Sequence, residues 1–183
     1  MKEAKQAQQA KLDFIKVSEQ DRIKAILEIA KALDANKQEL IQANQHDILA
    51  AKQDQLSKAM IDRLEMNESR INALIDSVKA IANQEQVVGE ITQTMTRPDG
   101  LIIQKQRIPL GVIGMIFESR PNVVIDCSCL AIKSGNCIIL KGGKEAKHSN
   151  LYLAKLVQQA ISKYIPKLVV QLIESRQNVS QLL

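Results

Sequence analysis

The stretch RIPLGVIGMIFESRPNVVIDCSCLAIKSGNCIILKGGKEAKHSN, residues 107–150, decides the fold of this chain. Residues 110–117 form a nearly continuous apolar run, which is typical of a parallel strand covered on both faces, and residues 137–140 predict a second buried strand. Between them, residues 121–133 predict a helix that proline opens and Ser134-Gly135 ends. This order of elements indicates a parallel βαβ unit.

The same alternation continues toward the C-terminus. A helix is predicted over residues 147–164, and a third apolar strand over residues 168–173 follows Pro166. Right-handed crossovers would place the three strands in one parallel sheet, with a ligand at their carboxyl ends. The predicted fold class is therefore α/β, with a partial Rossmann-like sheet. Because such sheets normally contain more strands, we expect an incomplete chain with an exposed apolar edge.

The N-terminal half predicts helices. Ser18 with Asp21 approximates a capping box ahead of a helical apolar pattern, and Asn36 with Glu39 repeats the signal. A third helix is clearest over residues 71–82. These apolar stripes are expected to pack in the core.

The pattern changes near Gly89. Residues 91–97 and 101–107, joined by Pro98-Asp99-Gly100, predict a β-hairpin that serves as an edge ribbon or an oligomer contact. The expected organisation is a helical arm over residues 1–88, a bridging or oligomerisation hairpin over 89–108 and the first part of a nucleotide-binding domain over 109–183.

Composition excludes several function classes. Two Phe, two Tyr and no Trp offer few platforms for stacking nucleic-acid bases, and the net charge of +5 is spread out rather than gathered in a basic block. We expect a preference for anionic small molecules at most. No apolar run is long enough for a membrane span, and the N-terminus lacks the apolar core of a signal peptide, so a cytoplasmic protein is expected.

The cysteines and histidines do not predict a metal site. Cys127 and Cys129 are separated by one residue, where zinc-binding pairs usually have two or more, and His46 and His148 are distant in sequence. Together with Cys137, the cysteines lie in apolar stretches, which favours reduced and buried thiols.

Two loops that follow predicted strands are candidate binding sites. In the first, Arg120 could pair with a phosphate or carboxylate, and the amide of Asn122 could donate to a developing oxyanion. The same residues also fit a surface ion pair and an ordinary helix cap. In the second loop, Gly142 and Gly143 allow a close approach of the backbone, and the lysines around them suit a phosphate. An ordinary exposed turn is the alternative there.

Motifs in a specific order extend along nearly the whole chain. The central ones are Pro109-Leu110-Gly111-Val112-Ile113-Gly114, Glu118-Ser119-Arg120-Pro121-Asn122, Lys133-Ser134-Gly135-Asn136 and Leu140-Lys141-Gly142-Gly143. Others are Asp62-Arg63-Leu64, Val88-Gly89-Glu90, Arg97-Pro98-Asp99-Gly100-Leu101, His148-Ser149-Asn150 and Val170-Gln171-Leu172-Ile173. In these motifs the chain resembles the gamma-glutamyl phosphate reductase family, also called glutamate-5-semialdehyde dehydrogenases, of the aldehyde dehydrogenase superfamily.

The resemblance implies an enzyme of proline biosynthesis that reduces L-glutamate 5-phosphate to L-glutamate 5-semialdehyde with NADPH. A cysteine thiolate attacks the acyl phosphate in this family, and hydride then reduces the thioester. That cysteine lies downstream in a second domain, so the resemblance implies that residues 1–183 are an N-terminal portion, inactive alone. It further implies a homo-oligomer, with glutamate 5-kinase as a potential partner.

The resemblance also assigns roles to residues. Lys141, Gly142, Gly143 and Glu145 are implied to bind NADPH, with Lys141 near the adenosine ribose and its 2′ substituent. Ser119 and Arg120 are implied to contact the substrate or its phosphate. Counting without gaps places the family's oxyanion asparagine at Arg120, whereas a shift of two residues places it at Asn122, so both remain candidates. A nucleotide-binding regulatory module and a structural or assembly fragment are the alternative functions.

Overall fold

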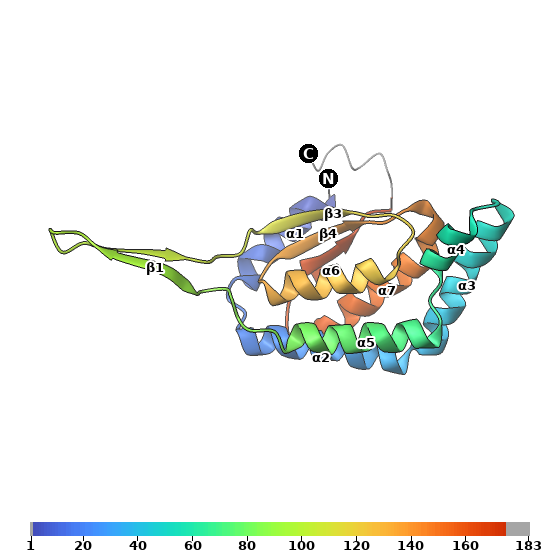
Figure 1. Cartoon of the computed structure of the whole chain (residues 1–183), viewed down its shortest axis with the longest axis horizontal. Helices are drawn as coiled ribbons and strands as arrows, with labels where there is room; N and C mark the ends of the chain where they lie inside the picture. The colour runs from blue at the N-terminus through green and yellow to red at the C-terminus, as the bar shows by residue number, and fades with distance from the viewer. Residues whose placement is uncertain (1, 175–183) are drawn as a thin grey trace.

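The computed structural model describes residues 2–174, which contain helices, a hairpin and a small parallel sheet (Figure 1). The helices are α1 (Lys2–Phe14), α2 (Glu19–Ala35), α3 (Lys37–Gln53), α4 (Lys58–Leu64), α5 (Glu68–Ala82), α6 (Asn122–Lys133) and α7 (Lys147–Ile161). The strands are β1 (Ile91–Thr96), β2 (Ile102–Gln106), β3 (Val112–Ile116), β4 (Cys137–Lys141) and β5 (Val170–Leu172). Short 3-10 turns precede α7 and β5.

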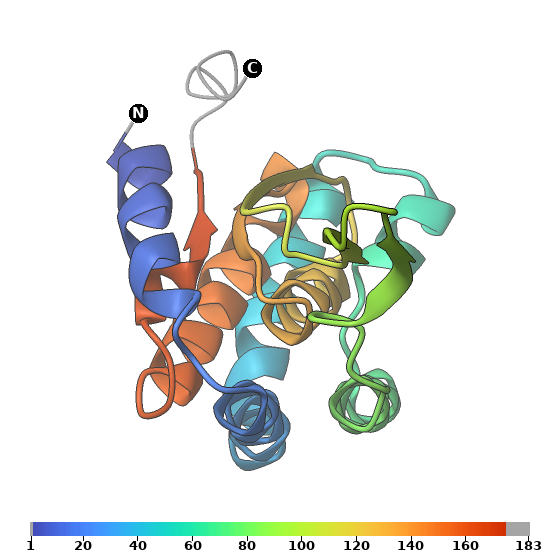
Figure 2. The same ribbon diagram turned by 90° about the vertical axis from the view of Figure 1, so that its left-hand side faces the viewer.

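The parallel sheet has the strand order β3-β4-β5, which confirms the predicted fold class. Because the order advances in one direction, right-handed crossovers place α6 and α7 on the same face. Helix α1 packs against the opposite face, mainly over β4, with Ala7, Ala10 and Phe14 buried (Figures 1 and 2). Strand β4 is thereby covered on both sides, and residues 137–140 are buried.

Strand β3 differs from its prediction. It forms the edge of the three-stranded sheet, and it is only partly covered. Ile116 is 60% exposed, and Leu110, which the sequence placed in the strand, precedes it and is 87% exposed. The expectation of a strand covered on both faces is therefore right for β4 and wrong for β3, because α1 lies chiefly over β4 and β5.

The two predicted capping residues behave differently. Ser18 caps α2, since its Oγ accepts the backbone N–H of Asp21 at 3.1 Å. Asn36 does not cap α3 as predicted; its amide instead donates to the carbonyl of Ala32 at 2.7 Å. Only this one residue separates α2 from α3, and its side chain serves the end of the first helix rather than the start of the second.

Helix α6 ends as the sequence predicts. Gly135 adopts a φ of +72°, a left-handed conformation that glycine reaches without a steric penalty. The guanidinium of Arg22 and the ring of Pro109 lie so close that a Cβ at Gly135 would collide with Arg22. Helix α7 ends at Ile161, earlier than predicted. The carbonyl of Ile161 accepts hydrogen bonds from the backbone N–H groups of Tyr164 and Ile165.

The predicted hairpin is present and projects away from the rest of the molecule (Figure 1). Strands β1 and β2 pair in antiparallel fashion, and all their residues are exposed. Arg97 donates its backbone N–H to the carbonyl of Leu101 at 2.9 Å, and Gly100 at the turn has a φ of +87°. The ribbon therefore has no partner surface within residues 2–174.

One hydrophobic core joins the N-terminal helices to the sheet. It extends from Ala7 in α1 to Ile173 after β5. In Figure 2, α2 and α5 are seen end-on below the sheet layer, with α6 and α7 between them and the strands. The division at residues 88 and 108 stays a prediction, and residues 175–183 of the proposed last domain lie outside the described residues.

Candidate functional site

The two candidate loops meet at the carboxyl ends of β3 and β4. Oε1 of Glu145, in the turn after β4, accepts hydrogen bonds from both the backbone N–H and the Oγ of Ser119, each at 2.7 Å. Ser119 follows β3 and has a φ of +37°, which is unusual for a residue other than glycine. The hydrogen bonds hold this loop in a conformation that costs backbone energy.

The carboxyl group of Glu145 is held in its charged form. Desolvation by burial favours the protonated acid, but hydrogen bonds from its own backbone and from Ser119, together with the charge of Lys141, outweigh that effect and lower its pKa. The contact between the loops is therefore a charge-assisted one.

A cavity of about 240 Å³ lies beside the glycine turn, at the carboxyl ends of β4 and β5. We call it the lysine cavity. It is lined by Lys141, Gly142, Gly143, Lys144, Lys147, Asn150, Leu151, Leu172, Ile173 and Glu174. The three lysines form no ion pair with any residue of the described segment 2–174. Their charges remain available to an anion.

Asn150 gives the lysine cavity a polar inner wall. Its side chain is buried, and its Oδ1 has no hydrogen-bond partner among the described residues. A buried acceptor without a partner is costly. A Cβ at Gly142 would collide with Nδ2 of Asn150 and would lie 3.1 Å from the ring of Phe117. Glycine is therefore needed for the turn to lie this close.

The start of α7, which carries Asn150, is fixed by an acidic side chain from α3. The carboxylate of Asp47 accepts the backbone N–H groups of His148 at 2.9 Å and Ser149 at 2.7 Å. These N–H groups have no partner inside their own helix, so Asp47 satisfies donors at the positive end of α7. Asn44 adds a buried hydrogen bond to Oγ of Ser149 at 3.0 Å.

The sequence-predicted cofactor residues do not all face the lysine cavity. Lys141, Gly142 and Gly143 line it, and the ammonium of Lys141 donates to the carbonyl of Gly142. Glu145 does not line it, because its carboxylate turns toward Ser119. The direct cofactor contact of Glu145 stays a prediction.

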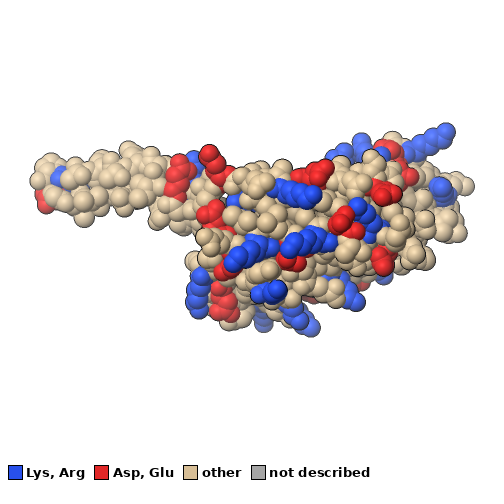
Figure 3. Space-filling view, turned by 90° about the horizontal axis from the view of Figure 1, so that it is seen from below, with Lys and Arg blue, Asp and Glu red and all other residues tan. Residues whose placement is uncertain are grey.

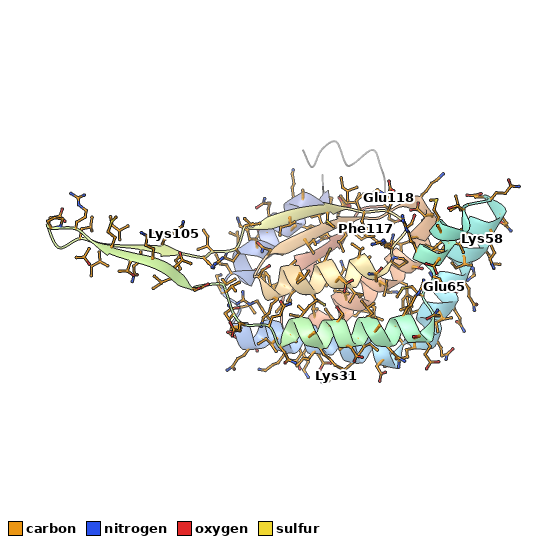
Figure 4. The ribbon with its side chains drawn as sticks, in the orientation of Figure 1. Lys31, Lys58, Glu65, Lys105, Phe117 and Glu118 are labelled. Atoms are coloured by element: carbon orange, nitrogen blue, oxygen red, sulfur yellow. The ribbon has the colours of Figure 1, made fainter. Side chains whose placement is uncertain are left out.

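A second cavity, of about 410 Å³, joins the loop after β3 to α4, α5 and α6. We call it the arginine cavity. It is lined by Asp62, Arg63, Glu65, Met66, Arg70, Ala73, Leu74, Ser77, Arg120, Asn122 and Asp126. Figure 4 shows the surroundings: Glu65, Phe117 and Glu118 lie toward one end of the molecule, and Lys105 lies on the hairpin at the other.

Arg120 and Asn122 both line the arginine cavity, and neither has the ordinary role considered for it. Arg120 is exposed and forms no ion pair within residues 2–174. Asn122 is the first residue of α6, so it is not the N-cap, and its amide donates to Asp126 at 2.9 Å. The substrate and oxyanion roles of Ser119, Arg120 and Asn122 remain predictions.

All three cysteines pack in or against the hydrophobic core. Cys129 and Cys137 are fully buried, and Cys127 is partly buried against the core. Desolvation raises the pKa of all three thiols, to about 11 for Cys137. A thiol with a raised pKa is a poor source of thiolate near neutral pH, so these three groups are not activated nucleophiles.

Residues 2–174 contain neither a metal-binding cluster nor a membrane-spanning helix. No cluster of three or more His, Cys, Asp or Glu side chains is arranged to hold a metal ion. No helix in the same residues has the length and apolar character to cross a membrane.

Sequence reasoning overlooked several residues that line the cavities. Arg70 and Asp126 carried no local signal, because α5 and α6 meet only in the folded chain. Asn150 offered one: it lies at helical spacing from the apolar residues Leu153, Ala154 and Val157, so a buried polar side chain that needs a partner could be expected there.

Comparisons with known proteins place these features in one family. The model of the aldehyde dehydrogenase family matches residues 1–183. A gamma-glutamyl phosphate reductase of Petrotoga mobilis is 42% identical over 175 residues, which are 95% of this chain and 42% of that protein. The chain thus spans less than half the length of the curated relatives it matches.

Solved structures with a similar fold carry the same name as these curated relatives. The gamma-glutamyl phosphate reductase of Thermotoga maritima has a TM-score of 0.94 and 34% identity, covering 99% of this chain and 44% of its own. The enzyme of the same name from Saccharomyces cerevisiae has a TM-score of 0.92 and 34% identity, covering 100% of this chain and 47% of its own. By the match along its whole length and by this fold, the chain belongs to the aldehyde dehydrogenase family.

Proposed function

We propose that this chain binds NADPH in the lysine cavity as part of an enzyme of proline biosynthesis that reduces L-glutamate 5-phosphate to L-glutamate 5-semialdehyde and releases phosphate. The names of the similar proteins support the reaction. The observation that carries the proposal is the cavity itself, where Lys141, Lys144 and Lys147 surround a glycine turn beside Asn150.

The lysine cavity suits a phosphorylated dinucleotide. Its lysines would hold the 2′-phosphate of the adenosine ribose. The position at the carboxyl ends of the strands is the usual ligand site of open parallel sheets. When bound, NADPH supplies the hydride of the reduction.

The loop after β3 would orient the acyl phosphate. Arg120 is exposed at the rim of the arginine cavity and would pair with the phosphate, which is the leaving group. The amide of Asn122 or the guanidinium of Arg120 would stabilise negative charge on the acyl oxygen. Glu145 holds this loop against the turn of the lysine cavity through Ser119, so the two binding regions keep a fixed spacing.

The thiols of this chain do not take part in the chemistry under this proposal. Acyl transfer to a cysteine requires a thiolate, and the buried Cys129 and Cys137 have raised pKa values. Under this proposal none of the three is the nucleophile.

The hairpin is proposed as the surface through which copies of the protein associate. It is exposed throughout, and its middle part carries few charges in Figure 3, whereas positive and negative residues are intermixed on the visible face of the body. Exposed apolar residues on this ribbon include Met95, Ile102 and Ile103. Association with glutamate 5-kinase is a further proposal, since it would deliver the labile acyl phosphate directly.

Calorimetric titration of the 183-residue chain with NADPH and with NADH tests the cofactor assignment. We expect saturable binding of NADPH and weaker binding of NADH, because only NADPH carries the 2′-phosphate. Equal affinities would remove the proposed role of the lysines, and no binding of either nucleotide would overturn the assignment.

A further inference from the structure

The arginine cavity contains six ionisable side chains from three parts of the chain. Three of them satisfy one another. Arg70 donates to the carboxylate of Asp62 at 2.7 Å and lies 3.9 Å from the carboxylate of Glu65. Its guanidinium also donates to the backbone carbonyls of both residues. This group therefore fixes the link between α4 and α5, and its two carboxylates and one guanidinium leave one net negative charge on the side of Asp62 and Glu65.

The other three ionisable side chains are Arg63, Arg120 and Asp126. Within the described residues none of them forms an ion pair. Asp126 accepts hydrogen bonds only from neutral groups there, namely the amide of Asn122 at 2.9 Å and the hydroxyl of Ser77 at 3.4 Å. These three side chains carry two positive charges and one negative charge that no described residue neutralises.

We propose that the arginine cavity recognises the α-amino acid end of the substrate: Asp126 binds the α-ammonium, Arg63 binds the α-carboxylate, and Arg120 is left for the phosphate. This inference rests on the proposed function and names residues that set its specificity. The charges of L-glutamate 5-phosphate, one positive centre and two negative ones, are complementary to the three unpaired side chains. Charge-assisted hydrogen bonds of this kind are among the stronger ones in proteins.

The floor of the cavity suits the rest of such a substrate. Met66 and Leu74 line it and are buried, with 4% and 5% exposure, and Ala73 adds a small apolar surface. These groups would contact the methylene carbons between the α-carbon and the acyl phosphate. The volume of about 410 Å³ lies within the range of small-molecule sites.

The arrangement would also exclude simple aldehydes and their acyl phosphates. A ligand without the α-ammonium leaves Asp126 in the cavity without a cationic partner, and one without the α-carboxylate leaves Arg63 unpaired. Leaving a charged group of a binding site unpaired costs affinity, and such penalties are a common source of specificity. The cavity therefore selects for a zwitterion.

The test uses the 183-residue chain and three ligands that differ by one group each. L-Glutamate carries both groups, glutarate lacks the α-ammonium, and 4-aminobutyrate lacks the α-carboxylate. Affinities are measured by NMR chemical-shift titration, with and without NADPH. We expect L-glutamate to bind on the order of tenfold more tightly than either analogue, as one lost charge-assisted contact implies.

Two variants test which residue binds the α-ammonium and which binds the α-carboxylate of the ligand. Asp126→Asn is expected to lose the preference for L-glutamate over glutarate while it keeps its affinity for glutarate. Arg63→Gln is expected to lose the preference over 4-aminobutyrate in the same selective way. Asp99→Asn and Arg97→Gln, which make the same chemical changes on the exposed hairpin, serve as matched controls and should keep both preferences.

The outcomes separate this inference from the proposed function. Equal affinities for the three ligands in the unaltered chain would overturn the inference without any variant being made. Preferences that persist in Asp126→Asn and Arg63→Gln would overturn the residue assignment. NADPH binding without L-glutamate binding would contradict the inference alone, whereas selective L-glutamate binding without NADPH binding would contradict the cofactor assignment alone.

Discussion

Glu145 holds Ser119 by two hydrogen bonds to a single oxygen, and this contact ties the turn after β4 to the loop after β3. The two loops belong to neighbouring parallel strands, so their meeting follows from the sheet order. The φ of +37° at Ser119 shows that the contact holds a conformation the chain would otherwise disfavour. A small chemical change at Glu145 should therefore affect the conformation of this loop.

Replacing Glu145 by Gln should destabilise the chain by about 1–2 kcal/mol near neutral pH, since hydrogen bonds to a charged acceptor become neutral ones and the side chain is partly exposed. Urea unfolding followed by circular dichroism measures the loss. The exposed neighbour Glu118, changed to Gln, is the matched control, and its effect should stay within about 0.5 kcal/mol. An equal loss in both variants would contradict the role of the contact.

The stability difference between the unaltered chain and Glu145→Gln should depend on pH. The folded-state pKa of Glu145 is lowered from its usual value of 4.5, so the charged carboxylate contributes its stability in full above that value. The contribution is lost as the pH falls through the lower folded-state pKa. The difference in unfolding free energy between the unaltered chain and Glu145→Gln should therefore shrink as the pH falls below 4.5 and on through the lowered folded-state pKa. A difference that grows with acidity would show the opposite sign of the shift.

Gly142→Ala should weaken NADPH binding on the order of tenfold, because the new Cβ collides with Nδ2 of Asn150 and displaces the wall of the lysine cavity. Gly114→Ala is the control: a Cβ there meets nothing within 4 Å, and its φ is not in the left-handed region. Calorimetric titration of both variants compares them. Unchanged affinity in Gly142→Ala would show that the ligand does not use this turn.

The thiols should react slowly with a disulfide reagent in the folded chain. Cys127 is expected to react first because it is only partly buried, while Cys129 and Cys137 should become reactive only on unfolding. Thiol counting with and without denaturant distinguishes the three. In the reverse assay with glutamate 5-semialdehyde, phosphate and NADP⁺, turnover by residues 1–183 that disappears when one of these cysteines is replaced would overturn this assignment.

The hairpin proposal predicts that Ile103→Glu reduces the size of any assembly formed by the chain. Ile103 pairs with Met95 across the ribbon, whereas Thr94 pairs with Gln104 in the adjacent cross-strand position on the other face. Thr94→Glu adds the same charge there and should have a smaller effect. Light scattering of the three proteins at equal concentration provides the measurement. A stable monomer in the unaltered chain would remove the basis for this proposal.

The part of the fold that the sequence predicts depends on local chemistry. The end of α6 at Gly135 follows from its left-handed backbone, and the buried β4 follows from its apolar residues. The packing of helix α1 on the sheet escaped prediction because its buried positions, Ala7 and Ala10 among them, are small and sit among polar residues. Only its packing on the sheet reveals them.

The candidate site was predictable where it follows the ends of strands. Arg120 and Lys141 could be named because ligands in parallel sheets bind at the carboxyl ends. The arginine cavity could not be foreseen, since Arg63, Arg70 and Asp126 come from three segments that only the packing of α5 on α6 brings together. The exposure of β3 was likewise a property of strand order and not of its apolar sequence.

The most direct test of the cofactor assignment is the ratio of the NADPH and NADH dissociation constants in the unaltered chain and in Lys144→Gln. Lys144 is exposed at the lysine cavity, so its loss should remove a contact to the 2′-phosphate without disturbing the core. We predict that NADPH binding weakens on the order of tenfold while NADH binding stays the same. Equal weakening of both nucleotides, or no change in either, would contradict the assignment of the lysine cavity to NADPH.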